Sequence, residues 1–166
     1  MRRTVFALAA LLVAAPALAQ EPVGCDKFKW PLDKERDMLA NPAALPASGA
    51  VTVTAPLASA FKLGLFPADA AKLPMPPTRA PKPGTNAGAV SIPALPKSGI
   101  YRITLSEGAW IDVFQDNKDV KSVAFSGATG CAGVRKSVKF ELDAKPFIIE
   151  ISGTGARSVS FVITPD

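Results

Sequence analysis

The segment SVKFEL at residues 137–142 alternates between apolar and polar side chains, as does SVSFVI at residues 158–163. A period of two residues is typical of a β-strand with one buried face. Two apolar faces of this kind bury best against each other, which predicts two stacked sheets with these segments on opposite sides of the core.

Other short segments on both sides of these two have strand-like composition, and turn residues separate them. We predict about nine strands, at residues 50–54, 61–66, 89–92, 100–105, 110–115, 120–125, 137–142, 147–152 and 158–163. The pair Asp116-Asn117 predicts a tight turn that makes 120–125 the hairpin partner of 110–115. The fold class is therefore an all-β, antiparallel, jelly-roll-like β-sandwich.

The regions before the sandwich have a different composition. Residues 1–19 have a positive start, an apolar stretch and a final Ala-Leu-Ala, which predicts a signal peptide and a periplasmic or secreted protein. Residues 20–48 should form an extended lead, with Phe28 and Trp30 as anchors, and a short amphipathic helix at 32–40. The sandwich domain would span 49–166, with a proline-rich loop at 73–84 that cannot form regular structure.

Charge and cysteine content limit the classes of partner and the compartment. Without Arg2 and Arg3 the net charge falls from +5 to +3, and the basic residues are scattered, so we expect no nucleic-acid partner. No further segment resembles a membrane anchor once the signal is cleaved. Cys25 and Cys131 are the only cysteines, and in an oxidising compartment they should form a structural disulfide.

Residues 98–164 carry a resemblance to a known family. Gly99, Tyr101, Ile103 and Leu105 follow a G-x-Y-x-h-x-h pattern, in which h is hydrophobic, and residues 147–153 follow h-x-h-x-h-x-G. The segment resembles the small secreted β-sandwich modules of the bacterial pre-peptidase C-terminal type. The resemblance implies an accessory, non-catalytic module, here without an attached peptidase.

The chain has no histidine. Catalysis by Ser-His-Asp or Cys-His groups and a two-histidine iron site are therefore excluded. Short exported chains of this layout also resemble proteins labelled as dioxygenases, and the missing histidines argue against that activity. The remaining enzymatic alternative is a carboxylate-dependent hydrolase, with Glu107 or Glu141 paired with an aspartate.

The hairpin around residues 110–120 carries the candidate ligand surface. Its aspartates could hold Ca²⁺, although Asp and Asn are also the residues that a tight turn favours, and we expect no cofactor. The aromatic residues on this strand are a binding surface if they face solvent and core if they face inward, and the second arrangement is the more common. The candidate residues are Trp110, Asp112, Phe114, Asp116, Asn117 and Asp119.

These features together predict an exported, non-catalytic periplasmic binding or interaction module. Its expected partner is an envelope protein or a polysaccharide. The contact would be made through the loops, to which the proline-rich segment 73–84 could add a docking surface if it is more than a stiff connecting loop.

Overall fold

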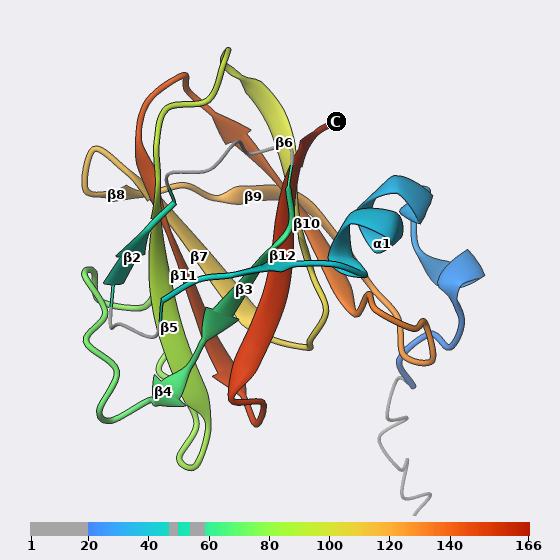
Figure 1. Ribbon diagram of the computed structural model, residues 1–166, viewed down its shortest axis with the longest axis horizontal. Helices are drawn as coiled ribbons and strands as arrows, with labels where there is room; N and C mark the ends of the chain where they lie inside the picture. Colours follow the sequence, from blue (N-terminus) through green and yellow to red (C-terminus); the bar gives the residue numbers. More distant parts are fainter. Residues whose placement is uncertain (1–19, 47–49, 54–58) are drawn as a thin grey trace, which may run out of the picture.

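The computed structural model describes residues 20–46, 50–53 and 59–166. Two β-sheets pack face to face, which confirms the predicted all-β sandwich (Figure 1). A short 3-10 turn, η1 (Cys25–Lys27), and one helix, α1 (Asp33–Leu39), precede the strands, close to the helix predicted at 32–40. The predicted signal peptide, residues 1–19, lies outside the described residues.

Within the described residues each sheet contains six strands. The prediction of purely antiparallel sheets is wrong, because each sheet includes one parallel pair at an edge. The helix-side sheet has the order β1-β3-β12-β6-β10-β9. Its strands are β1 (Ala43–Ala44), β3 (Phe61–Gly64), β12 (Ser158–Pro165), β6 (Gly99–Leu105), β10 (Lys136–Leu142) and β9 (Ser122–Gly127). The second sheet is here called the strap-side sheet, because residues 68–85 cross its outer face. It has the order β2-β5-β11-β7-β8, with β4 paired to β5. Its strands are β2 (Ala50–Thr52), β5 (Asn86–Ile92), β11 (Phe147–Thr154), β7 (Trp110–Gln115), β8 (Lys118–Asp119) and β4 (Phe66–Pro67).

The main core lies between the sheets and consists of side chains that alternate along their strands. Phe140 and Phe161 are almost fully buried there, with Ile149 and Ile151 of β11 in the same cluster. The prediction that 137–142 and 158–163 face each other from opposite sheets is wrong. Both belong to the helix-side sheet, where β6 lies between them, so their apolar faces point the same way toward the strap-side sheet.

The turn after β7 has the predicted residues but a different partner strand. Asp116 and Asn117 have φ angles of 51° and 59°, as in a type I′ turn. The chain returns only as the two-residue β8, and β9 then crosses to the helix-side sheet and pairs with β10. The predicted pairing of 110–115 with 120–125 is therefore wrong beyond Val120, whose N–H donates to the Val113 carbonyl oxygen at 2.8 Å. Alternation identifies a strand but not the sheet that it joins.

A second apolar cluster covers the outer face of the helix-side sheet. The predicted anchors Phe28 and Trp30 pack against it, and the Trp30 indole N–H donates a hydrogen bond to Ser137 Oγ at 3.2 Å. The predicted disulfide is confirmed: Cys25 and Cys131 are bonded and attach this N-terminal layer to the sandwich. No helix in the described part of the chain is long and apolar enough to cross a bilayer.

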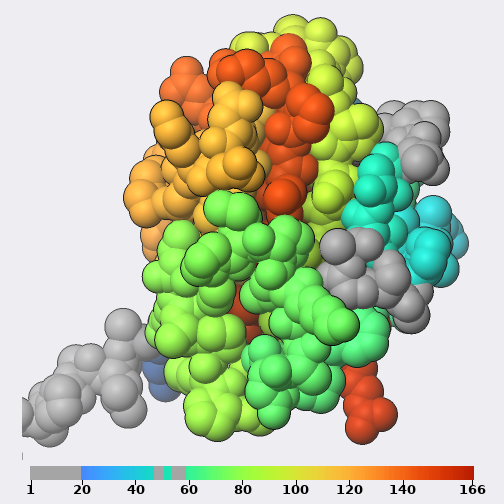
Figure 2. Space-filling view, turned by 90° about the vertical axis from the view of Figure 1, so that its left-hand side faces the viewer, coloured from blue at the N-terminus to red at the C-terminus, as the bar shows by residue number. Residues whose placement is uncertain are grey.

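Residues 68–85, here called the strap, cross the outer face of the strap-side sheet between β4 and β5 (Figure 2). The strap contains no helix or strand, in agreement with the prediction for its proline-rich part, 73–84. Its two ends are joined by a hydrogen bond from the Ala68 N–H to the Thr85 carbonyl oxygen at 2.9 Å. The strap is therefore a covering layer of the sandwich as well as a connection.

Candidate ligand-binding site

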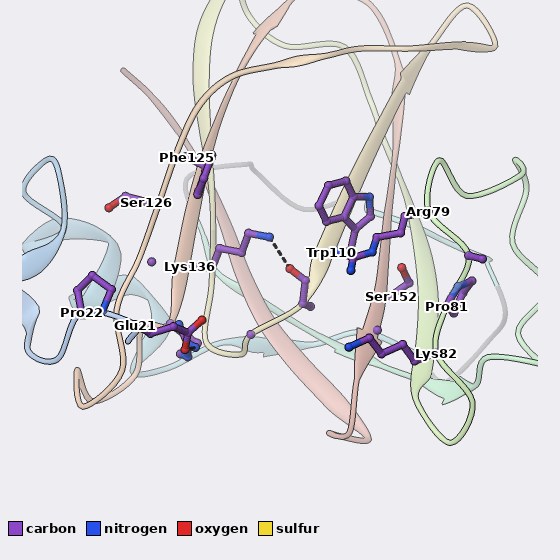
Figure 3. A pocket seen from close by; sticks show the side chains of 16 residues that line it. Glu21, Pro22, Arg79, Pro81, Lys82, Trp110, Phe125, Ser126, Lys136 and Ser152 are labelled. Carbon is purple, nitrogen blue, oxygen red and sulfur yellow. Dashed lines mark hydrogen bonds and ion pairs between the residues drawn. The ribbon is translucent and has the colours of Figure 1, made fainter. Parts of the chain in front are cut away.

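A pocket of about 510 Å³ opens where the strap meets one end of the sandwich. It lies between the strap, the start of β7, the end of β9 and the start of β10 (Figure 3). Its lining combines two aromatic rings with four basic side chains, and Glu21 from the N-terminal lead is at its margin. The aromatic and basic members are Arg79, Lys82, Trp110, Phe125, Arg135 and Lys136.

Trp110 stands at the centre of this pocket and is held by hydrogen bonds. Its indole N–H donates to Asp112 Oδ1 at 2.9 Å and to Thr78 Oγ1 at 3.2 Å. The Arg79 guanidinium lies 5.4 Å from the ring centroid, and the Lys136 ammonium lies 5.3 Å from it. Cations at this distance are attracted to the electron-rich face of an indole. The ring therefore supports two cations of the pocket.

The side chains of Lys136 and Arg135 are held by main-chain carbonyl groups. The Lys136 ammonium donates to the Ala109 carbonyl oxygen at 2.7 Å (Figure 3). Burial lowers the pKa of Lys136, and the nearby charges of Arg135 and Arg79 lower it further. Arg135 donates to the Ala128 carbonyl oxygen at 3.3 Å and forms an ion pair with Glu21. The pocket therefore concentrates positive charge that is only partly neutralised.

Beneath the strap, two carboxylates lie side by side. Asp112 on β7 and Glu150 on β11 are directly paired across the antiparallel strands, and they are 3% and 1% exposed. The backbone N–H of Thr78 donates to Asp112 at 3.1 Å, and that of Met75 donates to Glu150 at 2.8 Å. These acids attach the strap to the sheet, and neither lines the pocket.

Glu150 accepts fewer hydrogen bonds than Asp112, its cross-strand partner. Burial raises the pKa of Glu150 from 4.5 to about 7; the hydrogen bond from Met75 opposes this rise, and the negative charge of Asp112 adds to it. Its second oxygen, Oε2, is buried and accepts no hydrogen bond from the described residues. Between about pH 4.5 and 7 the folded protein therefore keeps a proton that the unfolded chain has lost, so stability decreases as the pH rises through this range.

The six residues predicted as a ligand surface do not form one site. Only Trp110 lines the pocket. Asp112 holds the strap, and Phe114 is buried. The other three surround the distant turn, where Asp116 pairs with Lys145, Asp119 pairs with Lys121, and Asn117 supplies a positive φ angle.

The carboxylates considered for Ca²⁺ are also dispersed. In residues 20–46, 50–53 and 59–166, no group of three or more His, Cys, Asp or Glu side chains is arranged to hold a metal ion. Of the two acids considered for a hydrolase, Glu141 lies in a different sheet from Asp112: Glu141 faces Ile100 of β6, whereas Asp112 faces Glu150. Glu107 lies in the connection between β6 and β7.

Sequence reasoning missed most of the groups that form the pocket and its support. Arg79 and Lys82 lie in a proline-rich stretch with no periodicity, so nothing local places them beside Trp110. Glu150 did carry a signal, because it is the one charged residue in the apolar segment FIIEIS at 147–152. A lone acid in such a strand indicates a buried group with a specific partner.

The comparisons with known proteins find no matching family model, no similar curated protein and no similar solved structure.

Proposed function

We propose that this protein is an exported, non-catalytic module that binds a segment of polysaccharide in the pocket beside Trp110. The main observation behind this proposal is the pocket itself, in which the indole of Trp110 is fixed by two hydrogen bonds and flanked by basic side chains. The sequence of residues 1–19 supports export, and a disulfide is compatible with an oxidising compartment. The resemblance to accessory β-sandwich modules supports a binding role.

The composition of the pocket favours binding over catalysis. Among the described lining residues, Glu21 is the only carboxylate, and it is paired with Arg135. Hydrolysis driven by carboxylates needs an unpaired acid within hydrogen-bonding reach of the substrate. The acids best suited to that chemistry, Asp112 and Glu150, are covered by the strap.

The shape of the site favours a polysaccharide over a folded envelope protein. A stable protein interface usually buries roughly 1,200–2,000 Å² in total and is broad. The pocket of about 510 Å³ is recessed between the strap and the end of the sandwich, which suits a narrow chain. The backbone N–H groups of Met75 and Thr78 in the strap already donate to Glu150 and Asp112 of the sheet, so they cannot donate hydrogen bonds to a partner protein.

Filling the pocket should remove binding without changing charge. Ala80 lines the pocket from the exposed strap, and Ala80→Trp places an indole in the space that the ligand would occupy. We expect native electrophoresis through gels containing purified polysaccharides to show retardation of the wild type and none of this variant. Ala132→Trp is the matched control, because Ala132 is exposed and does not line the pocket.

The panel of gels should include polygalacturonate, dextran sulfate and neutral dextran. If the wild type migrates normally in all of them, the proposal is wrong. Equal retardation of the wild type and Ala80→Trp would place binding elsewhere on the surface. That result would also contradict the proposal.

A carboxylate-dependent hydrolase is the second candidate, and one observation favours it. Asp112 and Glu150 are cross-strand partners, and burial raises the pKa of Glu150 to about 7. Two acids in different environments are the pattern of an acid–base pair. Such an enzyme would have to lift the strap to admit substrate. Release of reducing ends from polygalacturonate by the wild type, and its loss in Asp112→Asn and Glu150→Gln, would establish this candidate, and no release would eliminate it.

A further inference from the structure

The charges of the pocket are too unbalanced for a site built only for neutral sugars. Four basic side chains and one carboxylate line it. Burial is the main cause of the lowered pKa of Lys136, and the positive charges of Arg135 and Arg79 lower it further, so these cations repel one another. Of the described residues, none forms an ion pair with Arg79, Lys82 or Lys136. A bound anion would relieve this repulsion, which gives anionic ligands an advantage.

The cations lie on opposite walls of the pocket. Arg79 and Lys82 come from the strap, whereas Lys136 begins β10 and Arg135 directly precedes it (Figure 3). Trp110 lies between the two groups in the same view. Two separated points of positive charge suit a ligand that carries acidic groups on more than one unit.

The surroundings of Trp110 point the same way. A sugar ring stacks on an aromatic face when that face is free. Here Arg79 and Lys136 lie within about 6 Å of the ring centroid, the range of a cation–π contact. The indole is therefore better placed to hold cations toward a ligand than to stack on a neutral sugar.

The carboxylate of Glu21 occupies the position beside Arg135 that an acidic group of such a ligand would take. Its carboxylate pairs with Arg135 at the margin of the pocket, and its side chain is 63% exposed on the N-terminal lead. An exposed ion pair contributes little to stability, so an anion from outside can replace it at small cost. Arg135 stays in place when Glu21 leaves, because it also donates to the Ala128 carbonyl oxygen.

We infer that the pocket takes a linear polyanionic glycan, with carboxylate or sulfate groups on successive units, and that one such group displaces Glu21 from Arg135. This inference rests on the proposed function and adds the chemical class of the ligand. The cations line the walls of a pocket and do not form a flat face, which favours a single glycan chain over a flat anionic lipid surface. Fixed negative charge on the ligand is the recognised feature.

The test is isothermal titration calorimetry of the purified exported protein with four probes. The probes are trigalacturonate, its fully methyl-esterified form, inorganic sulfate, and vesicles containing phosphatidylglycerol. We expect the free acid to bind at least tenfold more tightly than the neutral ester, and its affinity to fall as salt is added, because charge pairs at partly exposed sites are screened. Sulfate alone should bind far more weakly than the trimer.

Three variants connect this affinity to the named residues. Arg79→Ala/Lys82→Ala should weaken trigalacturonate binding about tenfold or more, since hydrogen bonds to charged groups are the strong ones. Lys72→Ala/Lys118→Ala makes the same change of net charge at exposed positions outside the pocket and should leave the affinity unchanged. Glu21→Gln should increase the affinity about threefold, the size expected when an exposed competing pair is removed.

The outcomes separate this inference from the proposed function. Equal binding of the acid and its ester would overturn the inference and leave a polysaccharide module in place. Binding to vesicles but not to trigalacturonate would overturn it in favour of a lipid headgroup. An unchanged or reduced affinity in Glu21→Gln would contradict the displacement step. If no glycan in the gels or the calorimeter binds, both proposals fail together.

Discussion

Removing the Cys25–Cys131 disulfide should lower the free energy of unfolding by about 5 kcal/mol in the chain-entropy model of cross-links. The bond joins residues 106 positions apart, so it closes a loop that includes most of the sandwich. Opening that loop gives the unfolded chain many more conformations. Urea denaturation of the wild type and of Cys25→Ser/Cys131→Ala at one pH would measure the difference.

Reducing agent provides the control for this experiment. It should destabilise the wild type to about the level of the double variant and have no effect on the variant itself. A loss below about 1 kcal/mol, the net value of one ordinary hydrogen bond, would contradict the expectation. The lead would then be held mainly by its other contacts, such as the Val23–Thr129 bridge and the packing of Phe28 and Trp30.

The disulfide also shows what the sequence could reveal about long-range structure. Two cysteines allow only one intramolecular disulfide, so the contact between the N-terminal lead and residue 131 was predictable. Strand positions were predictable as well, because alternation such as that of SVKFEL is local. The helix at Asp33–Leu39 followed from the spacing of its buried face.

Strand partners were not predictable in this way. Alternation with a period of two residues shows that a strand has one apolar face and one polar face. It does not show which sheet the strand joins: β10 and β12 lie in one sheet, and their pattern would be the same if they lay in two. The short β8 gave no recognisable signal, because two residues contain no period. Its absence from the prediction led to the incorrect hairpin with 120–125, whereas β9 pairs with β10 in the other sheet.

The candidate site was predictable only at Trp110. The basic side chains of the pocket come together because of the path of the strap, which is fixed by the backbone N–H groups of Met75 and Thr78. Backbone N–H groups are present at every residue except proline, so no side-chain pattern marks these two as the anchors. The acceptors, Asp112 and Glu150, are the part of this contact that the sequence displays.

Replacing Glu150 with Gln should raise the free energy of unfolding by about 3 kcal/mol at pH 8 and change it little at pH 4. At pH 8 the wild type must hold a buried carboxylate beside Asp112, whereas Gln is neutral. Gln can still accept the hydrogen bond from the Met75 N–H, because Oε1 is retained. Urea denaturation at intervals from pH 4 to pH 8 would measure the effect.

The sign of this prediction follows from where the proton is held. The pKa of Glu150 is raised to about 7 in the folded protein, so its contribution is fully present below about pH 4.5 and is lost as the pH rises to about 7. The variant should lack this decrease. Glu141→Gln is the matched control, because Glu141 is exposed on β10, and its pH profile should follow that of the wild type. Parallel profiles for the wild type and Glu150→Gln would show that the carboxylate is hydrated in the native protein.

The same variant tests whether the lost stability is concentrated in the strap. Glu150 contacts the strap through Met75, so ionisation should loosen residues 68–85 before the sandwich unfolds. Limited proteolysis of the native protein should therefore cut the strap of the wild type faster at pH 8 than at pH 5, after correction for the pH dependence of the protease on a peptide substrate. In Glu150→Gln the corrected rates should be equal. Because Arg79 and Lys82 lie on this segment, the protonation of Glu150 would then also determine how firmly the strap wall of the pocket is held.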